Sequence, residues 1–107
     1  MAHSVPAASV KKIVIACEAG MGSSLMAANK LKQMLKKAGF QDIQVTHSPV
    51  RALTEDAQIV LSHEGLSAMA RSKAPWAVCF AFKNFMNIPA YDKIINALKA
   101  GEDIVED

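Results

Sequence analysis

The chain has 107 residues, of which 51% are hydrophobic and 21% charged. This length suits one compact domain, and the composition excludes a chain that is disordered or fibrous as a whole. No apolar run approaches the roughly 20 residues that span a bilayer, and residues 1–9 lack the basic start and apolar centre of a secretory signal. We therefore expect a soluble, intracellular domain.

Charge is distributed unevenly along the chain. The formal net charge is +2, but residues 1–101 contain 12 basic and 6 acidic residues, a formal charge of +6. The other acidic residues lie in 101–107, which we expect to form a disordered acidic tail. The excess of positive charge favours an anionic ligand or partner. Nucleic-acid binding is not expected, because the lysines are spread out and no aromatic residues are interleaved with a basic stretch.

The first part of the chain predicts a strand followed by a helix. Residues 1–10 are small and polar, so we expect a flexible N-terminus. Residues 13–17 form a continuous β-branched run, which predicts a strand buried on both faces. Two glycines in residues 18–22 break this pattern, and the next two serines are suitable N-cap residues. Helical spacing of apolar residues then continues to residue 38, and Gly39 suits a C-terminal cap.

The remainder of the chain predicts three more strands and two more helices. The strands cover residues 43–46, 58–62 and 76–82, the first of them near a sheet edge. A short helix over residues 65–72 should direct Leu66, Met69 and Ala70 inward, and a final helix over residues 91–100 should bury Tyr91, Ile94, Ile95 and Leu98. Alternation of strands and helices predicts an α/β domain, with a four-stranded parallel sheet and helices on both faces.

The loop after the first strand is the candidate functional site, because ligands of open α/β sheets bind beyond the carboxyl ends of the strands. Cys17 ends that strand, and the following loop returns the chain to the start of a helix. Backbone N–H groups, two glycines and the positive helix end can surround a phosphoryl group there, and the same field favours thiolate at Cys17. The sequence thus predicts Cys17 as nucleophile. The expected phosphate-binding loop comprises Glu18, Ala19, Gly20, Met21, Gly22, Ser23 and Ser24.

Two nucleotide-binding motifs are excluded by spacing. The dinucleotide fingerprint needs glycines at three positions, and the nucleotide P-loop needs a lysine that does not occur before Lys30. No pair of potential ligands has metal-binding spacing. We therefore expect neither a nucleotide nor a metal cofactor.

The order of residues in the loop resembles the phosphate loop of low-molecular-weight protein tyrosine phosphatases. That family has Arg where this chain has Ser23. Without the guanidinium group, nothing holds a phosphate bidentately or neutralises the charge that develops on hydrolysis. A phosphoryl group could be accepted on sulfur yet not readily lost to water.

A second resemblance covers roughly residues 11–100. Residues 13–24 (IVIACEAGMGSS) resemble the phosphorylation loop of the mannitol-type IIB component of the bacterial sugar phosphotransferase system (PTS), although Glu18 stands where that loop has Asp. Residues 45–48, 59–63 and 83–86 resemble the same family. The resemblance and related folds imply a Rossmann-like or flavodoxin-like domain with strand order 2-1-3-4, related to the low-molecular-weight phosphatases. The PTS IIB domain would span residues 11–100.

The PTS resemblance implies a carrier function. Cys17 would accept a phosphoryl group from a phosphohistidine of a IIA component and pass it to a sugar bound by the membrane component IIC, with mannitol or a related polyol as the sugar. The domain would be cytoplasmic and held at the inner face of the membrane through IIC.

Two alternatives remain open. The chain could be a phosphatase of similar architecture, or a non-catalytic regulatory domain that uses Cys17 as a redox sensor. Cys79 lies in an apolar strand and is expected to be structural. His47 and His63 follow strand ends, so either histidine could approach the site or lie on the surface.

Overall fold

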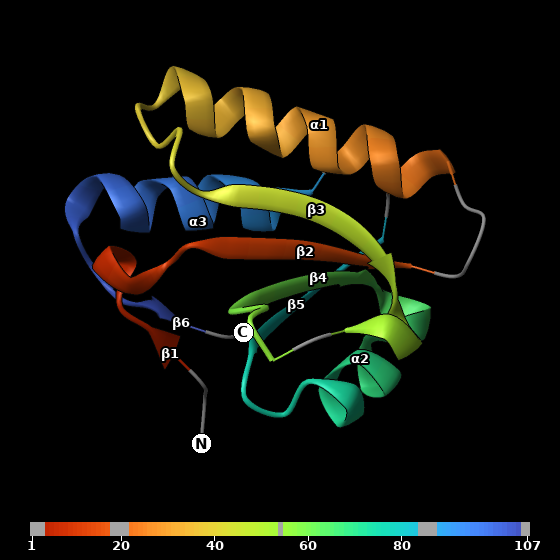
Figure 1. Cartoon of the computed structure of the whole chain (residues 1–107). Coiled ribbons are helices and arrows are strands. Elements are labelled where there is room, and N and C mark those ends of the chain that lie inside the picture. Colours follow the sequence, from red (N-terminus) through yellow and green to blue (C-terminus); the bar gives the residue numbers. More distant parts are fainter. Residues whose placement is uncertain (1–3, 18–21, 54, 84–87, 106–107) are drawn as a thin grey trace.

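The computed structural model describes residues 4–17, 22–53, 55–83 and 88–105, with the backbone alone at residues 17 and 22–24. Its centre is a four-stranded parallel sheet in the order β3-β2-β4-β5 (Figure 1). The strands are β2 (Lys12–Cys17), β3 (Gln44–Pro49), β4 (Ile59–His63) and β5 (Val78–Phe82). This order is the predicted one, 2-1-3-4, and it confirms the α/β fold class.

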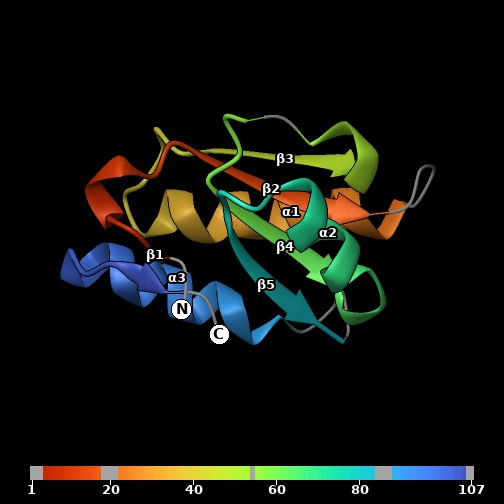
Figure 2. The same cartoon turned by 90° about the horizontal axis from the view of Figure 1, so that it is seen from below.

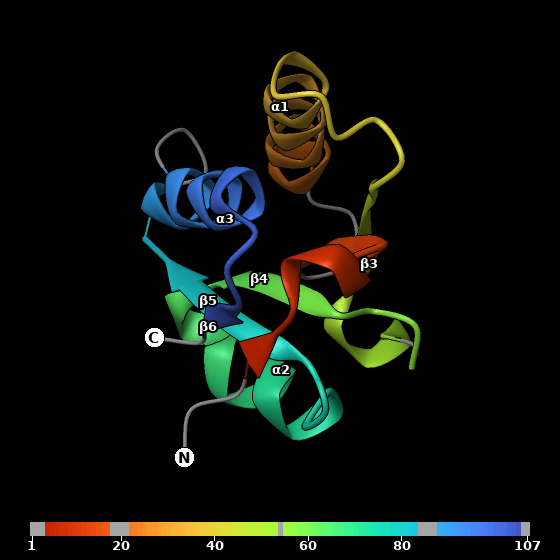
Figure 3. The ribbon, with the colours of Figure 1, turned by 90° about the vertical axis from the view of Figure 1, so that its left-hand side faces the viewer.

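Helices cover both faces of this sheet. Helices α1 (Gly22–Lys37) and α3 (Pro89–Ala100) lie side by side on one face, and α2 (Ser67–Lys73) covers the other (Figure 3). Three short 3-10 turns, η1 (Ala7–Ser9), η2 (Val50–Ala52) and η3 (Glu64–Leu66), lie in the described connections. This layered arrangement is that of flavodoxin-like and low-molecular-weight phosphatase domains.

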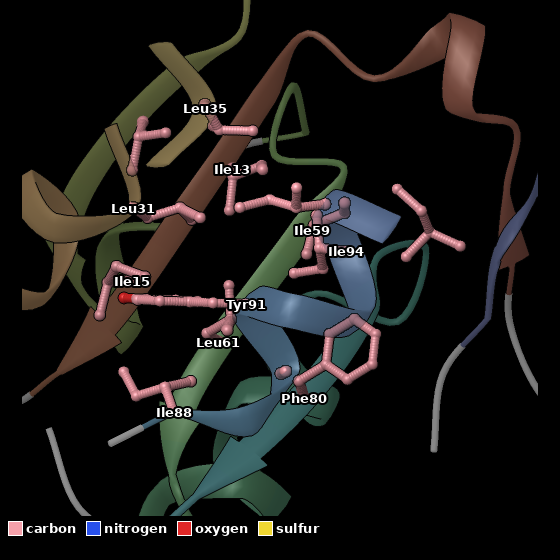
Figure 4. Close-up of a cluster of buried hydrophobic side chains, with 14 of the residues drawn as sticks. Ile13, Ile15, Leu31, Leu35, Ile59, Leu61, Phe80, Ile88, Tyr91 and Ile94 are labelled. Atoms are coloured by element: carbon pink, nitrogen blue, oxygen red, sulfur yellow. The ribbon is translucent and has the colours of Figure 1, made fainter. Parts of the chain in front are cut away.

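Alternation along each strand divides the core into two layers. Residues that point to one face, such as Ile13 and Ile15 of β2, pack with α1 and α3 (Figure 4). Residues that point to the other face, such as Val14 and Ala16, pack with α2. Both layers are apolar because a parallel sheet covered by helices is buried on its two faces.

The ends of the two long helices are set by glycines, as the sequence predicts for Gly39. Gly39 has φ +91°, and the N–H of Phe40 donates to the carbonyl of Leu35 at 2.8 Å, which closes the last turn of α1. Gly101 has φ +70° and ends α3 in the same way. The lysines of α1 are exposed, as expected for its solvent-facing side: Lys30, Lys32, Lys36 and Lys37.

The inward direction predicted for Met69 and the strand start predicted at Trp76 are wrong. Met69 is 53% exposed, because only Ala70 of the short helix α2 is buried and Leu66, in η3, is half-buried. Trp76 precedes β5 rather than opening it and is 44% exposed. Its indole N–H donates to the carbonyl of Ala57 at 3.0 Å, so the ring lies over the surface with its polar atom satisfied.

Short strands lie in the described parts of the two end segments, for which the sequence predicts a flexible start and a disordered tail. Strand β1 (Ser4–Val5) pairs antiparallel with β6 (Ile104–Val105), and Ile104 is buried. The side chain of Gln58 accepts hydrogen bonds from the N–H groups of Lys11 and Lys12 and donates to the carbonyl of Ser9. Hydrogen bonds and apolar burial therefore order segments whose composition alone is polar.

Candidate active site

Cys17 is the last residue of β2, one of the two central strands. All four parallel strands end at the same edge of the sheet (Figure 2). In the observed registers Cys17 pairs with Pro49 of β3, and Ala16 pairs with Ser62 of β4. Continuing the second register by one residue places position 17 beside His63. With this continued register, the carboxyl edge carries the row Pro49, Cys17, His63 and Phe82, of which Cys17 with Pro49 and His63 with Phe82 are observed pairs.

The start of α1 lies just beyond this row. The helix begins at Gly22, only five residues after Cys17. Ser23 and Ser24 thus lie in its first turn rather than at the predicted N-cap position, a shift of one or two residues. The first N–H groups of an α-helix have no acceptor within the helix, so this end presents donors and a partial positive charge. The predicted loop residues Glu18, Ala19, Gly20 and Met21 lie outside the described residues.

The core fixes where α1 begins. Ala27, Ala28, Leu31 and Leu35 repeat at helical spacing and are at most 1% exposed, so one side of α1 is held on the sheet. Tyr91 of α3 donates its hydroxyl to the carbonyl of Ala27 at 2.7 Å. Burial raises the pKa of Tyr91 above its usual value, so this hydroxyl stays protonated as a donor at neutral pH. Because Ala27 lies in the second turn, this contact holds the helix near the start that faces Cys17.

The structure separates the two histidines that the sequence left open. His63 ends β4 in the carboxyl-edge row, half-buried, and its Nδ1 accepts a hydrogen bond from the N–H of Gly65 at 3.2 Å. Its ring also meets Phe82 edge to face, with 6.2 Å between centroids. His47 is exposed and pairs with Ile15, two residues before the end of β2. Only His63 is therefore a neighbour of position 17 in the sheet.

Four exposed residues near this edge were not among the predicted site residues. Arg51 follows β3 by two residues and Lys83 directly follows β5, so both add positive charge at the carboxyl edge. Leu25 and Met26 lie in the first two turns of α1 and are 47% and 61% exposed. For Lys83 the sequence signal was its place directly after the predicted strand 76–82, whereas Arg51 lies five residues beyond the predicted strand 43–46. The exposed apolar pair could not be identified from spacing, because isolated apolar residues in a helix are usually buried.

Cys79 is buried, as expected for a structural cysteine. It is 2% exposed in β5, and its sulfur lies 3.7 Å from the carbonyl oxygen of Ala77. Among the residues that the structure describes, no group of three or more His, Cys, Asp or Glu is placed to hold a metal ion. None of the helices in the described ranges is long and apolar enough to cross a membrane.

The fold and site together define a class: an α/β domain with a cysteine at the carboxyl end of a central strand and a helix that starts five residues later. Comparison with known families specifies it further. Residues 12–97 match the model of the family described as "PTS system, Lactose/Cellobiose specific IIB subunit". The chain belongs to this family of PTS IIB subunits, as the resemblance of its loop predicted.

The names of individual relatives specify mannitol, whereas the family description specifies lactose and cellobiose. The chain is 48% identical over 92 residues to the "PTS system mannitol-specific EIICB component" of Geobacillus stearothermophilus, covering 86% of this chain and 19% of the relative. The protein of the same name in Bacillus subtilis strain 168 is 46% identical over 91 residues, 85% of this chain and 19% of the relative. That of Staphylococcus carnosus is 39% identical over 94 residues, 88% and 18%. The chain thus spans about a fifth of the length of these relatives.

Proposed function

We propose that this domain carries a phosphoryl group on Cys17, which it receives from a phosphohistidine of a IIA component and delivers to a sugar bound by a membrane component IIC. The sugar is mannitol or a related polyol. Membership of the IIB family and the mannitol-specific names of relatives up to 48% identical support this assignment. The domain works at the inner face of the membrane, docked on IIC.

One observation carries the choice of Cys17. It ends a central strand of the sheet, and α1 begins five residues later, so the cysteine lies where an open α/β sheet binds its ligands. The helix end supplies N–H donors and partial positive charge to a thiolate and to the phosphoryl group that it receives. Cys79 lacks both features, because it lies buried inside β5.

The transfer consists of two displacements at phosphorus. The thiolate of Cys17 attacks the phosphoryl group, an S–P bond forms, and the P–N bond of the donor breaks. The donor nitrogen keeps the electron pair and takes up a proton. In the second step a sugar hydroxyl attacks, an O–P bond forms, and Cys17 leaves as thiolate while the hydroxyl proton is released. Positioning and charge stabilisation suffice for such transfers.

The function is tested by phosphorylating the whole chain. Incubation with phosphoenolpyruvate, the general phosphotransferase proteins and the mannitol IIA of Bacillus subtilis should add one phosphoryl group, which intact-mass analysis detects and peptide mapping assigns. We expect Cys17→Ser to abolish the label and the matched variant Cys79→Ala to retain it. Equal labelling of Cys17→Ser, or a label on Cys79, would show that the carrier assignment is wrong.

The sugar is tested separately. Membranes that contain the IIC part of the Bacillus subtilis mannitol protein should transfer phosphate from the labelled chain to mannitol, and not to lactose or cellobiose. The family description names the latter two sugars for other members, so they are the appropriate competitors. Transfer to cellobiose but not to mannitol would contradict the proposed sugar. It would not contradict the proposed phosphorylation of Cys17.

A further inference from the structure

His63 is the residue of β4 that follows Ser62, and Ser62 pairs with Ala16, the residue of β2 before Cys17. Cys17 ends β2, and the register Ala16 to Ser62 continues to positions 17 and 63. Neighbouring strands are about 4.8 Å apart, so a side chain at position 63 reaches a group bound at position 17. The corresponding neighbour on β3 is Pro49, which offers no side-chain donor. Of the two strands beside β2, only β4 thus places a donor-bearing side chain in the row of Cys17.

Both positions belong to the face that α1 covers. Ile13 and Ile15 of β2 and Ile59 and Leu61 of β4 pack in the core layer beneath α1 and α3. Alternation of the strands assigns positions 17 and 63 to the same face. Phe82, the neighbour of His63 on β5, packs in this layer as well. In the proposed function, a phosphoryl group between Cys17 and the start of α1 is therefore on the side of the sheet that carries His63.

The hydrogen bond from the N–H of Gly65 determines which ring nitrogen of His63 bears a proton. Nδ1 accepts that bond, so it has no proton, and in the neutral ring the proton is on Nε2. The edge-to-face contact with Phe82 limits rotation of the ring. His63 is thus held as a donor with one defined N–H group.

We propose that the Nε2–H group of His63 donates a hydrogen bond to the phosphoryl group on Cys17, and so makes His63 a phosphoryl-binding residue of the proposed carrier site. The inference rests on the proposed function. No bond to His63 forms or breaks, and the proton stays on Nε2 during both transfers. A donor at this place supports the negative charge of the phosphoryl oxygens on the side of β4, while the α1 backbone supports it from the other side.

Two variants separate this role from a purely structural one. In His63→Asn the amide can replace Nδ1 as the acceptor for Gly65, but it has no group in the place of Nε2. In His63→Gln the longer amide can place an N–H donor near the position of Nε2. A donor role therefore predicts that Gln restores function and Asn does not, whereas a role limited to capping η3 predicts the reverse.

The first measurement is the single-turnover rate of transfer from radiolabelled phospho-IIA to the whole chain. We expect His63→Asn to lower this rate by about tenfold to a hundredfold, and His63→Gln to stay within about threefold of the wild type. The control His47→Asn should transfer at the wild-type rate, because His47 lies on the far side of β2 and two residues earlier. If His63→Asn does not fold, His63→Phe, which keeps a ring against Phe82, replaces it.

A second measurement does not depend on a donor protein. Inorganic phosphate is titrated into the unphosphorylated chain while NMR follows the amide signals of residues 22–24, and His63→Asn should weaken binding by a similar factor. Wild-type rate and binding in His63→Asn, or equal losses in the Asn and Gln variants, would overturn the role of His63. A wild-type chain that takes no label on Cys17 would instead overturn the proposed function.

Discussion

The hydroxyl of Tyr91 donates a 2.7 Å hydrogen bond to the carbonyl oxygen of Ala27, and this bond joins α3 to the second turn of α1 inside the core. Both residues are buried, at 3% and 1% exposure. The two helices that cover one face of the sheet are thereby connected close to the end of α1 that approaches Cys17. A contact within the core thus helps to position the start of α1 relative to the carboxyl edge of the sheet.

Tyr91→Phe should destabilise the fold modestly. The variant keeps the ring in the core and removes one hydrogen bond, whose net contribution is about 0.5–1.5 kcal/mol. The carbonyl of Ala27 retains its helical partner, so no buried acceptor is left wholly unpaired. Urea unfolding at pH 7 measures the change. Unchanged stability would show that water or another group replaces the tyrosine hydroxyl.

The stability of the wild type should fall at alkaline pH because of Tyr91. Burial raises the pKa of its hydroxyl above the usual value of about 10 in the folded state, while the unfolded chain ionises at the usual value. The stabilisation is fully present below pH 10 and is lost as pH rises above it, by up to about 1.4 kcal/mol per pH unit. Lysines titrate in the same range, so the comparison is with Tyr91→Phe. A constant difference between the two proteins from pH 8 to 11 would contradict this effect.

Ser62→Ala should leave the fold as stable or make it more stable. Ser62 is 1% exposed at the carboxyl end of β4, and its hydroxyl has no hydrogen-bond partner among the residues that the structure describes. Burying such a hydroxyl costs about 1–3 kcal/mol, which alanine avoids. The control is Ser67→Ala, because the Ser67 hydroxyl donates to the carbonyl of Glu64 at 3.0 Å. Thermal unfolding should rank Ser62→Ala above Ser67→Ala, and the opposite order would reveal a partner for Ser62.

Met26→Gln should weaken docking of the phosphoryl donor. Met26 is 61% exposed in the second turn of α1, near the helix end at which the proposed function places the approach of the phosphoryl donor to Cys17. Loss of an apolar contact at the centre of an interface should raise KM for phospho-IIA by about five- to tenfold with kcat retained. The matched control is Met69→Gln, since Met69 is 53% exposed on α2 over the opposite face of the sheet. Equal effects of the two variants would remove α1 from the docking surface.

Cys17 should be the more reactive thiol of the two. The N-terminal end of α1 favours thiolate, whereas Cys79 is buried in the core. Alkylation of Cys79→Ala by iodoacetamide should reach half its maximal rate at a pH below about 8.5, the reference for a free thiol. Cys17→Ser, which retains Cys79, should react slowly until it unfolds. Half-maximal alkylation of Cys17 above that reference would show that the helix end does not act on the sulfur.

Periodicity and composition sufficed for the central sheet. The β-branched run before Cys17 and the spacing of apolar residues in α1 each reflect burial that repeats along the element. A strand and a helix can therefore be predicted from the neighbouring residues alone. The strand order came by analogy with related folds, because local sequence does not record which strands are neighbours. Met69 was misplaced since a helix of seven residues is too short for spacing to show which side is covered.

The candidate site was predictable only in part. Cys17 and the helix after it stand together in the sequence, so their proximity follows from one strand, one loop and one helix. His63 lies 46 residues further along the chain, and only the register between β2 and β4 brings it beside Cys17. The sequence likewise could not distinguish His63 from His47, because both follow predicted strands, and the difference lies in which residue of β2 each one faces.

The pairing of β1 with β6 places both described ends of the chain at one corner of the domain. That corner lies on the side of the sheet where β2 begins, while Cys17 is the last residue of β2, and the strand between its two ends is roughly 17 Å long (Figure 1). A polypeptide joined to either end of the domain would therefore leave from the corner opposite the carboxyl edge of the sheet. In the proposed function, such a tether leaves the edge that carries Cys17 open to both of the proposed partners.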